Sequence, residues 1–199
     1  MLGLNHAANL GVTKRQPHTS VTRSRAGHNI GMLGMIWAQD KNGVLGANGG
    51  MLWRVPADFK HFKEVTWGHP VIMGRASFLA LGAALPSRRN IVLSRTPGFS
   101  APNIEVADSL ESALKLCAGQ PEVWITGGGG VYREAMPLAD LLAVTELDLE
   151  ASLPPGADVT YAPAIDSRSW RLDASRSDTD WREQSGDAAW RVKYYLASN

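Results

Sequence analysis

The fold is decided by Glu122-Val123-Trp124-Ile125-Thr126-Gly127-Gly128-Gly129-Gly130-Val131-Tyr132, where a short apolar run passes through four glycines into a helical pattern. An uninterrupted apolar run of this length is typical of a strand that is buried on both faces of a parallel sheet. Glycine has no Cβ, so four in succession let the backbone turn sharply and approach other groups closely. A strand followed at once by a tight turn and a helix predicts a β–α unit of an α/β fold.

Short apolar runs recur on both sides of this unit and alternate with helical or turn patterns. Pro56 suits the first position of a helix, because the N–H that proline lacks would have no partner there. The expected strands cover residues 35–38, 70–74, 90–94, 122–126 and 141–145, and the expected helices cover residues 56–65, 76–81, 109–117 and 131–136. Residues 170–173 and 190–196 alternate as the strands of a hairpin do. This order predicts an α/β sheet covered by helices on both faces.

The composition narrows the class of protein. Apolar residues make up 44% and charged residues 20% of the chain, which is typical of a globular protein and excludes a fully disordered one. The single cysteine, Cys117, excludes an intramolecular disulfide and a multi-cysteine metal site. No segment has the roughly 18–20 apolar residues that span a membrane, and a net charge of +1 gives no general reason to expect nucleic acid. The five histidines form no metal-binding pattern, so we expect one domain with no metal, membrane or nucleic-acid partner.

Residues 1–31 differ from the rest of the chain. They hold four basic residues and no acid, and they show no apolar periodicity. They also lack the apolar core of about 7–15 residues that a secretory signal needs. We expect a disordered basic leader or an extension read from an upstream start, since Met32 and Met35 stand just before the first apolar run. A transit peptide is the alternative, but no amphipathic face can be drawn through residues 16–19. The folded domain is then expected at residues 32–199.

The glycine run has two interpretations when it is taken alone. Free N–H groups at the start of a helix favour a phosphate, so residues 127–130 predict either a phosphate site or merely a tight strand–helix turn. The run matches neither the dinucleotide-binding fingerprint nor a P-loop, because no Gly-Lys-Ser/Thr follows it.

Asp58 also has two interpretations. It shares a predicted helix face with Phe62 and Val65, four and seven residues further on. A carboxylate in such a place is either an acid that interacts with the helix N-terminus or a buried group that binds a ligand. Trp53, which lies beside a glycine-rich loop, favours a pocket.

Several arginines stand at the ends of predicted strands, namely Arg75, Arg88, Arg89 and Arg95. Each of them alone is most simply a solvated surface charge. Ligands of open α/β sheets bind at the carboxyl ends of the strands, where Arg75 and Arg95 would lie. The arginines together therefore indicate an anionic ligand at one edge of the sheet.

Read in order, these segments resemble the dihydrofolate reductases, in particular the bacterial, chromosomal, single-domain type. The similarity runs from about residue 32 to the end of the chain, and the ordered set is far more specific than any one segment. The matching segments are Ile36-Trp37-Ala38, Gly43-Val44-Leu45-Gly46, Leu52-Trp53-Arg54-Val55-Pro56-Ala57-Asp58-Phe59, Val71-Ile72-Met73-Gly74-Arg75, Leu85-Pro86-Ser87-Arg88-Arg89-Asn90, the glycines with Val131-Tyr132, and Val144-Thr145.

The resemblance implies an α/β fold with an eight-stranded, mostly parallel sheet, a C-terminal antiparallel hairpin and helices on both faces. It implies an oxidoreductase that uses NADPH to reduce 7,8-dihydrofolate to 5,6,7,8-tetrahydrofolate, with the hydride passing to C6 and a proton to N5 of the pterin. It further implies a cis peptide bond between Gly127 and Gly128, and we expect a cytoplasmic monomer.

The same resemblance implies the substrate site. Asp58 would hold the amidine edge of the pterin, and Trp53 would position an ordered water near it. Arg88 would pair with the α-carboxylate of the substrate, and Thr145 would support Asp58. The residues implied to line the substrate are Ile36, Trp37, Asp58, Phe59, Phe62, Leu81, Leu85, Arg88, Thr126 and Thr145.

For NADPH the resemblance implies three groups of contacts. The nicotinamide would lie against Ala38 and the loop Val44-Leu45-Gly46-Ala47-Asn48-Gly49-Gly50. The adenosine phosphates, including the 2′-phosphate, would be held by Arg75, Ala76, Ser77, Ser94 and Arg95. The pyrophosphate would lie along Gly127, Gly128, Gly129, Gly130, Val131 and Tyr132.

The chain departs from the family pattern at two positions. Leu52 stands where proline usually precedes the tryptophan, and Thr126 where an aliphatic residue usually precedes the glycines. Two other functions are weighed against the reductase. A reductase of a pyrimidine intermediate in flavin synthesis would share the NADPH contacts, but Trp53 and Asp58 argue against it. An NADPH-binding module without catalysis would not need Asp58, Arg88 and Thr145.

Overall fold

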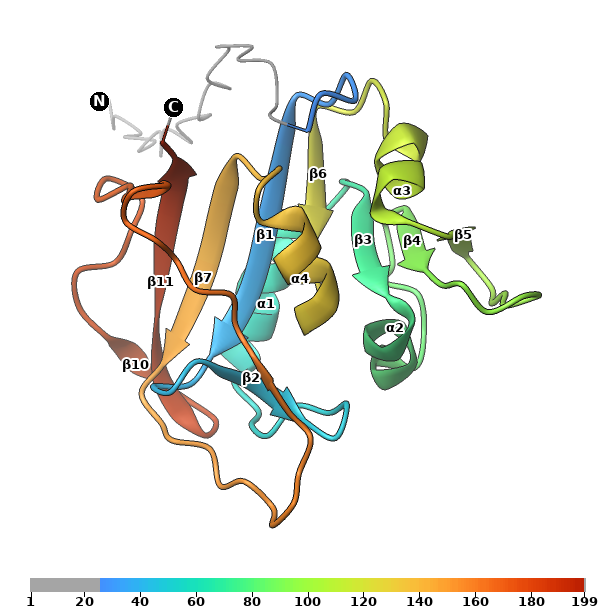
Figure 1. The fold of residues 1–199 in the computed structure, drawn as a ribbon. Coiled ribbons are helices and arrows are strands. Elements are labelled where there is room, and N and C mark those ends of the chain that lie inside the picture. Colours follow the sequence, from blue (N-terminus) through green and yellow to red (C-terminus); the bar gives the residue numbers. More distant parts are fainter. Residues whose placement is uncertain (1–25, 199) are drawn as a thin grey trace, which may run out of the picture.

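The computed structural model describes residues 26–198, and a mixed β-sheet runs through it (Figure 1). The sheet order is β10-β11-β7-β1-β6-β3-β4-β5, and β9 pairs with β11 beside this path. These strands are β1 (Met32–Gln39), β3 (Val71–Gly74), β4 (Asn90–Leu93), β5 (Ile104–Ala107), β6 (Glu122–Ile125), β7 (Leu141–Leu147), β9 (Trp170–Leu172), β10 (Arg182–Ser185) and β11 (Ala188–Ala197). The pairs from β7 to β5 are parallel, and those with β11 are antiparallel.

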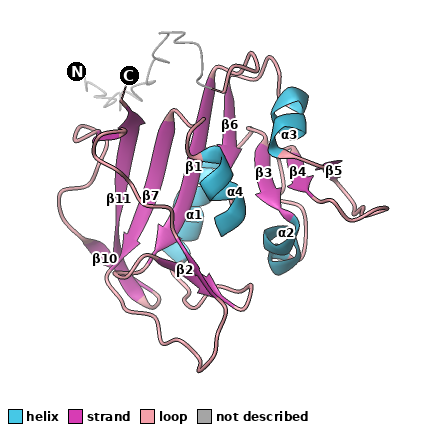
Figure 2. Cartoon of the chain, viewed as in Figure 1, coloured by secondary structure: helices cyan, strands magenta, loops and turns pink. Residues whose placement is uncertain are grey.

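Helices cover both faces of this sheet. They are α1 (Pro56–Thr66), α2 (Arg75–Leu81), α3 (Leu110–Leu116) and α4 (Gly129–Ala135). In Figure 1 α4 lies in front of the sheet and α1 behind it, and Figure 2 shows the strands as the layer between the helices. The predicted fold class, an eight-stranded and mostly parallel sheet with helices on both faces, is confirmed.

The two faces follow from the alternation of side chains along each strand. In β1, Met35 belongs to the apolar cluster under α3 and α4, while Ile36 belongs to the cluster under α1 and α2. In β7, Leu142 and Ala143 divide in the same way. The parallel strands inside the sheet are therefore buried on both sides, which explains the uninterrupted apolar runs of the sequence.

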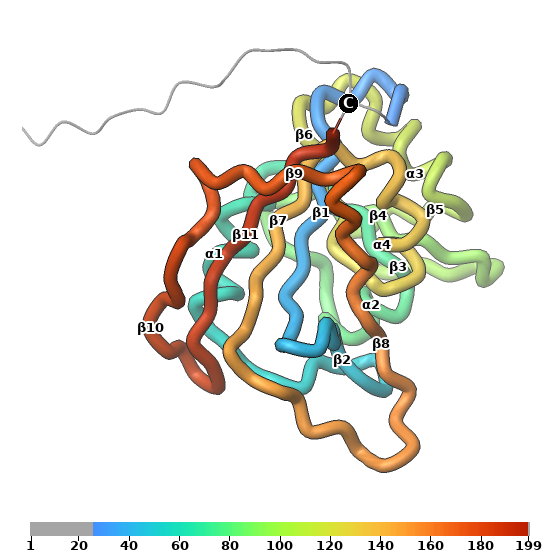
Figure 3. The backbone as a smooth tube through the Cα atoms, turned by 60° about the vertical axis from the view of Figure 1, so that its left-hand side comes forward, coloured from blue at the N-terminus to red at the C-terminus, as the bar shows by residue number. Residues whose placement is uncertain are grey.

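A second, two-stranded sheet joins β2 (Val44–Ala47) to β8 (Val159–Tyr161). The carboxyl ends of the parallel strands meet at one edge of the main sheet, and Figure 3 shows β2 at the lower end of β1. The stretch 44–50, which we expected to be a loop, is a strand followed by a tight turn. Asn48 and Gly49 have φ of 51° and 77°, the combination that a two-residue hairpin turn requires.

The sequence analysis places the C-terminal hairpin differently from the structure. Residues 170–172 and 188–197 do pair antiparallel, as β9 and β11, but they are not joined by a short turn. The hairpin partner of β11 is β10, which precedes it directly and which the sequence analysis did not find. Strands β5 and β8 were not predicted either. Among the described residues, no helix is long and apolar enough to cross a membrane.

The expected boundary after residue 31 does not match the contacts. Ala26 and Ile30 are 7% and 3% exposed and belong to the apolar cluster under α3 and α4. The Gly31 N–H donates to the Gln120 carbonyl, and the Gly119 N–H donates to the Asn29 carbonyl. Residues 26–31 therefore pack as part of the domain, while residues 1–25 of the expected leader lie outside the described residues.

Candidate active site

Asp58 lies in the first turn of α1 and is 8% exposed. Its carboxylate accepts a hydrogen bond from the hydroxyl of Thr145 on β7, a residue that is 1% exposed. Burial raises the pKa of Asp58 to about 6, because a charged carboxylate loses its hydration, and the Thr145 hydrogen bond opposes this rise. The N-cap residue of α1 is Val55, and its side chain makes no capping hydrogen bond. The Asp58 carboxylate is thus turned to the sheet, which favours the ligand-binding interpretation over the capping one.

The N-terminus of α1 is held by the β10–β11 hairpin. The Ala57 N–H donates to the Ser185 hydroxyl at 3.0 Å, and the Arg54 N–H donates to the Asp187 carboxylate at 2.7 Å. At Gly186 a Cβ would collide with the Arg54 carbonyl oxygen, so the backbone of the hairpin tip packs directly against the backbone at Arg54. Side chains far along the sequence therefore supply the acceptors that the start of α1 lacks.

Trp53 lies just before this helix and is 7% exposed. It packs in a third apolar cluster that also contains Val44 of β2 and, partly buried, Ala38 of β1. Its indole Nε1–H is buried and has no acceptor among the described residues. A buried donor of this kind is costly unless it meets a polar group.

Apolar side chains are exposed on α1, which carries Asp58, and on α2, which packs on the same face of the sheet. Phe59 of α1 and Leu81 of α2 are 43% and 51% exposed, which is high for side chains of this size. Phe62 and Leu85 are half-buried against the apolar cluster under α1 and α2. Exposed apolar side chains and a buried carboxylate on the same face of the sheet suit a flat, largely apolar ligand with one polar edge.

Arg88 is held by two hydrogen-bond acceptors and lies near two aromatic rings. Its Nε donates to the Pro86 carbonyl at 3.0 Å, and its Nη1 donates to the Thr66 hydroxyl at 2.9 Å. Thr66 is fully buried, and partial burial lowers the pKa of Arg88 without neutralising a guanidinium. The rings of Phe62 and Trp67 lie 6.0 and 5.8 Å from the guanidinium carbon. This fixed cation can still donate from Nη2 to an anion.

Tyr132 joins α4 to the backbone of β1. Its hydroxyl donates to the Ile36 carbonyl at 2.6 Å, and both burial and the charge of Asp58 raise its pKa. The Trp37 and Tyr132 rings pack at a tilt of 55° with their centroids 5.4 Å apart, and the Trp37 indole donates to Gln39. The structure thus places the Trp37 side chain on the α4 face, away from α1, because neighbouring residues of a strand point to opposite sides. Only its backbone is left for the implied substrate contact.

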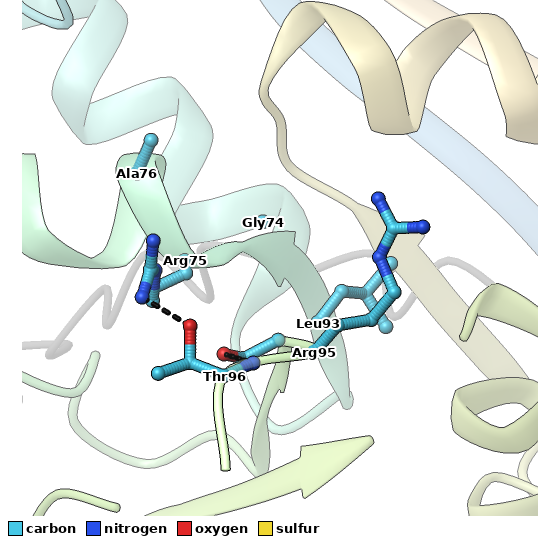
Figure 4. A pocket seen from close by; sticks show the side chains of 7 residues that line it. Gly74, Arg75, Ala76, Leu93, Arg95 and Thr96 are labelled. Carbon is cyan, nitrogen blue, oxygen red and sulfur yellow. Dashed lines mark hydrogen bonds between the residues drawn. The ribbon is translucent and has the colours of Figure 1, made fainter. Parts of the chain in front are cut away.

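A cavity of about 470 Å³ lies at the carboxyl ends of β3 and β4 (Figure 4). Four of its lining residues, Arg75, Ala76, Ser94 and Arg95, are among those implied to hold the adenosine phosphates. Gly74, Leu93 and Thr96 also line it, and the sequence analysis did not select them. Two guanidinium groups and two hydroxyls around one cavity suit a phosphate.

The glycine run lies beside the start of α2. The peptide bond between Gly127 and Gly128 is cis, as the resemblance implied. The Gly127 carbonyl accepts from the Gly74 N–H at 2.7 Å, and a Cβ on Gly128 would lie 3.0 Å from the Ser77 hydroxyl. A Cβ on Gly129 would lie 2.7 Å from the Thr160 methyl of β8. The run is therefore packed between α2 and β8, and side chains there would fill the space beside the cavity.

The stretch 44–50 reaches the same region through β8. The Asn48 N–H donates to the Asp158 carbonyl at 2.8 Å, directly before β8 begins. Ala47 and Gly50 exchange backbone hydrogen bonds across the turn. The structure thus gathers the residues implied for the nicotinamide, the pyrophosphate and the adenosine phosphates at one edge of the sheet.

The Thr126 hydroxyl donates to the Ile72 carbonyl at 3.4 Å.

The fold and the site together define a class of protein: an α/β enzyme with a buried carboxylate and a separate, guanidinium-lined cavity at the carboxyl ends of its strands. The family model for dihydrofolate reductase matches residues 32–194, and the chain belongs to the dihydrofolate reductase family.

Named relatives agree with this assignment. The chain is 42% identical over 170 residues to the dihydrofolate reductase of Mycobacterium tuberculosis H37Rv, covering 84% of this chain and 99% of the relative. It is 49% identical over 120 residues to the dihydrofolate reductase of Mycobacterium leprae, covering 59% and 73%. The solved dihydrofolate reductase of Enterococcus faecalis, complexed with NADP(H) and RAB-propyl, superposes with a TM-score of 0.75 at 31% identity, covering 84% of this chain and 97% of that one.

Proposed function

We infer that this chain catalyses the NADPH-dependent reduction of 7,8-dihydrofolate to 5,6,7,8-tetrahydrofolate, with the hydride delivered to C6 and a proton to N5 of the pterin. The observation that carries this proposal is Asp58, a buried carboxylate that is bonded to Thr145 and lies on a helix that also exposes Phe59. Membership of the dihydrofolate reductase family supports it independently.

Asp58 would accept two hydrogen bonds from the amidine edge of the pterin, as a carboxylate does from a guanidinium. Burial raises the pKa of Asp58 to about 6 because it destabilises the ionised carboxylate. Two hydrogen bonds from the pterin would stabilise that ionised form again. Thr145 would keep the carboxylate oriented. Asp58 then polarises the pterin toward protonation at N5, while the proton itself arrives through water.

Trp53 would position that water. Its buried Nε1–H lacks an acceptor among the described residues and lies five positions before Asp58 in the chain. The rings of Phe59 and Phe62, with Leu81 and Leu85, would wall the pterin and benzoyl groups. Arg88, which Thr66 and Pro86 hold in place, would pair with the α-carboxylate of the substrate.

The cofactor residues fit NADPH on three grounds. The cavity at Arg75 and Arg95 presents two cations, the glycine run offers backbone without Cβ atoms, and the solved Enterococcus faecalis relative is complexed with NADP(H). When bound, NADPH supplies the hydride. The chain's own contribution is to align the two ligands and to exclude water from the reacting atoms.

An assay that follows the loss of NADPH tests the proposal. The purified chain should oxidise NADPH rapidly with dihydrofolate and not with the pyrimidine intermediate of flavin synthesis. Turnover with the pyrimidine alone would establish the rival reductase. Binding of NADPH without turnover of either substrate would establish a non-catalytic module.

We also propose that the chain works as a monomer in the cytoplasm. All residues assigned to both sites come from one chain, so a second copy is not needed to complete them. Light scattering should give a mass near 21.5 kDa, whereas a mass of twice that value would contradict the monomer. Fractionation of cells that produce the chain tests the location.

A further inference from the structure

Arg75 is the more firmly held of the two cations at the cavity. Its Nη1 donates to the Thr96 hydroxyl, and the Phe99 ring lies 5.9 Å from its guanidinium carbon. Figure 4 shows the Arg75 guanidinium beside Thr96, with the Arg95 guanidinium pointing away from both. Within residues 26–198, no hydrogen bond or ion pair holds the Arg95 side chain.

The two groups that hold Arg75 belong to one turn. The Phe99 N–H donates to the Thr96 carbonyl at 3.2 Å, Pro97 follows Thr96, and Gly98 has a φ of 72°. Proline at the second position and a positive φ at the third are typical of a type II β-turn. The turn therefore presents the Thr96 hydroxyl and the Phe99 ring from a fixed backbone.

This turn is tied to the cavity and to the core. The Thr96 N–H donates to the Ser94 hydroxyl at 3.2 Å, and Ser94 is another lining residue. The Phe99 ring meets the buried Phe78 ring of α2 edge-on, with centroids 6.3 Å apart. Arg75 begins α2, so the turn and the arginine are joined through the same helix.

We propose that Thr96, supported by Phe99, is a positioning residue that holds Arg75 for the 2′-phosphate of the cofactor and so sets the preference for NADPH over NADH. The inference rests on the proposed function and concerns the cavity assigned there to the adenosine phosphates. A guanidinium has five N–H donors, so the bond to Thr96 leaves others free for a phosphate. Because the bond to Thr96 favours one arrangement of the Arg75 side chain, less rotamer freedom is lost when the phosphate binds.

The test measures the dissociation constants of NADPH and NADH on the full chain by quenching of tryptophan fluorescence. Thr96→Val keeps the shape and removes the hydroxyl, and we expect it to lower the NADPH preference about three- to tenfold, the range of one hydrogen bond. Thr96→Ser should restore the preference. In an Arg75→Ala background, Thr96→Val should change the preference no further, because the group that it positions is gone.

Thr179→Val is the matched control, since Thr179 is exposed and bonds only to the neighbouring Asp180. It should leave both constants unchanged, and thermal unfolding should show all variants folded. An unchanged preference in Thr96→Val, in a parent chain that prefers NADPH, overturns this inference alone. A parent chain without any preference overturns the assignment of NADPH, and this inference with it.

Discussion

At the scale of single residues, Asp58 shows how function and stability oppose each other. The folded chain holds a carboxylate where ionisation is unfavourable, and only the Thr145 hydroxyl offsets that cost before a ligand arrives. Such groups are typical of binding and catalytic sites, because a charge that is poorly stabilised in the free protein binds a complementary ligand more strongly.

Asp58→Asn should lower the rate of hydride transfer at pH 7 by about 10²–10⁴-fold, the usual contribution of acid–base assistance. The amide keeps the shape but carries no charge to polarise the pterin. Part of the rate should return at acid pH, where free substrate is protonated without help from the enzyme. Single-turnover kinetics across pH measure this effect. A variant with near-normal turnover at pH 7 would show that Asp58 has no role in proton transfer.

The same substitution should make the protein more stable at neutral pH. The pKa of Asp58 rises from about 3.8 in the unfolded chain to about 6 in the folded one, so the folded state holds this proton more tightly. Wild-type stability therefore falls as pH increases from about 4 to 6, by up to about 3 kcal/mol. Asp58→Asn should escape this loss and exceed wild-type at pH 7, and the two should converge below pH 4.

Urea unfolding at a series of pH values measures this difference. Asp108→Asn is a control of opposite sign, because hydrogen bonds from Ser112 and Ser109 lower the pKa of Asp108. That substitution should not stabilise the chain at pH 7. A loss of stability in Asp58→Asn at neutral pH would mean that the carboxylate acts mainly at the helix N-terminus.

Residue patterns could predict Asp58 and the arginines as candidates but could not choose between their interpretations. The resemblance to a family supplied the choice, since it assigns roles to Asp58, Arg88 and Thr145. The sequence analysis did not select Thr66 or Thr96. Each of them bonds to an arginine about 20 positions away, and no local sequence pattern indicates such a contact. The side chains of Trp37 and Ile36 lie on opposite faces of β1, because a strand sends neighbours to opposite sides, and the substrate contact of Trp37 stays a prediction.

At the scale of elements, the β10–β11 hairpin stabilises the start of α1. Ser185 and Asp187 accept from backbone N–H groups that would otherwise lack partners. The Gly186 backbone fits against Arg54 and Pro56 with no space for a side chain.

Gly186→Ala should therefore destabilise the chain and also impair turnover, because the start of α1 would have to move. Gly156→Ala is the matched control: both glycines have φ near 70°, but nothing lies within 4 Å of a Cβ at Gly156. Each alanine loses about 1 kcal/mol or more to the positive φ, and only Gly186→Ala adds a clash. Thermal unfolding and kcat measure both effects. Equal losses for the two variants would contradict the close contact.

The elements that the sequence predicted share a physical property that the missed ones lack. Strands β1, β3, β4, β6 and β7 are buried on both faces, so their apolar runs are unbroken. Strands β5, β8 and β10 lie at sheet edges or outside the main sheet and are less buried, so they lack an unbroken apolar run. Strand β2 was missed because its glycine-rich sequence was interpreted as a loop. Gly46 is needed within the strand, since it packs against the turn that follows.

At the scale of the whole molecule, the segment before β1 closes the end of the core under α3 and α4. Ile30 and Ala26 are buried there, and backbone bonds join Asn29 and Gly31 to the segment that leads into β6. The domain thus includes residues that composition alone had assigned to the leader.

A chain that starts at Met32 should be less stable than one in which an initiator methionine precedes Ala26. Loss of a buried isoleucine side chain costs about 2–5 kcal/mol, and the two backbone hydrogen bonds are lost as well. Ile30→Ala in the longer chain should reproduce most of the difference. Urea unfolding of the three chains tests this, and equal midpoints would show that residues 26–31 contribute nothing.

The hairpin that supports α1 also sets when the active site can form during synthesis. Arg54 and Asp187 are 133 positions apart, so at about 5–20 residues per second the ribosome adds the partner on the order of ten seconds after Arg54. Strand β11, which completes the free edge of β7, is made later still. A nascent chain therefore carries Asp58 on a helix whose start is unsupported, and the site is assembled only when the last hairpin leaves the ribosome.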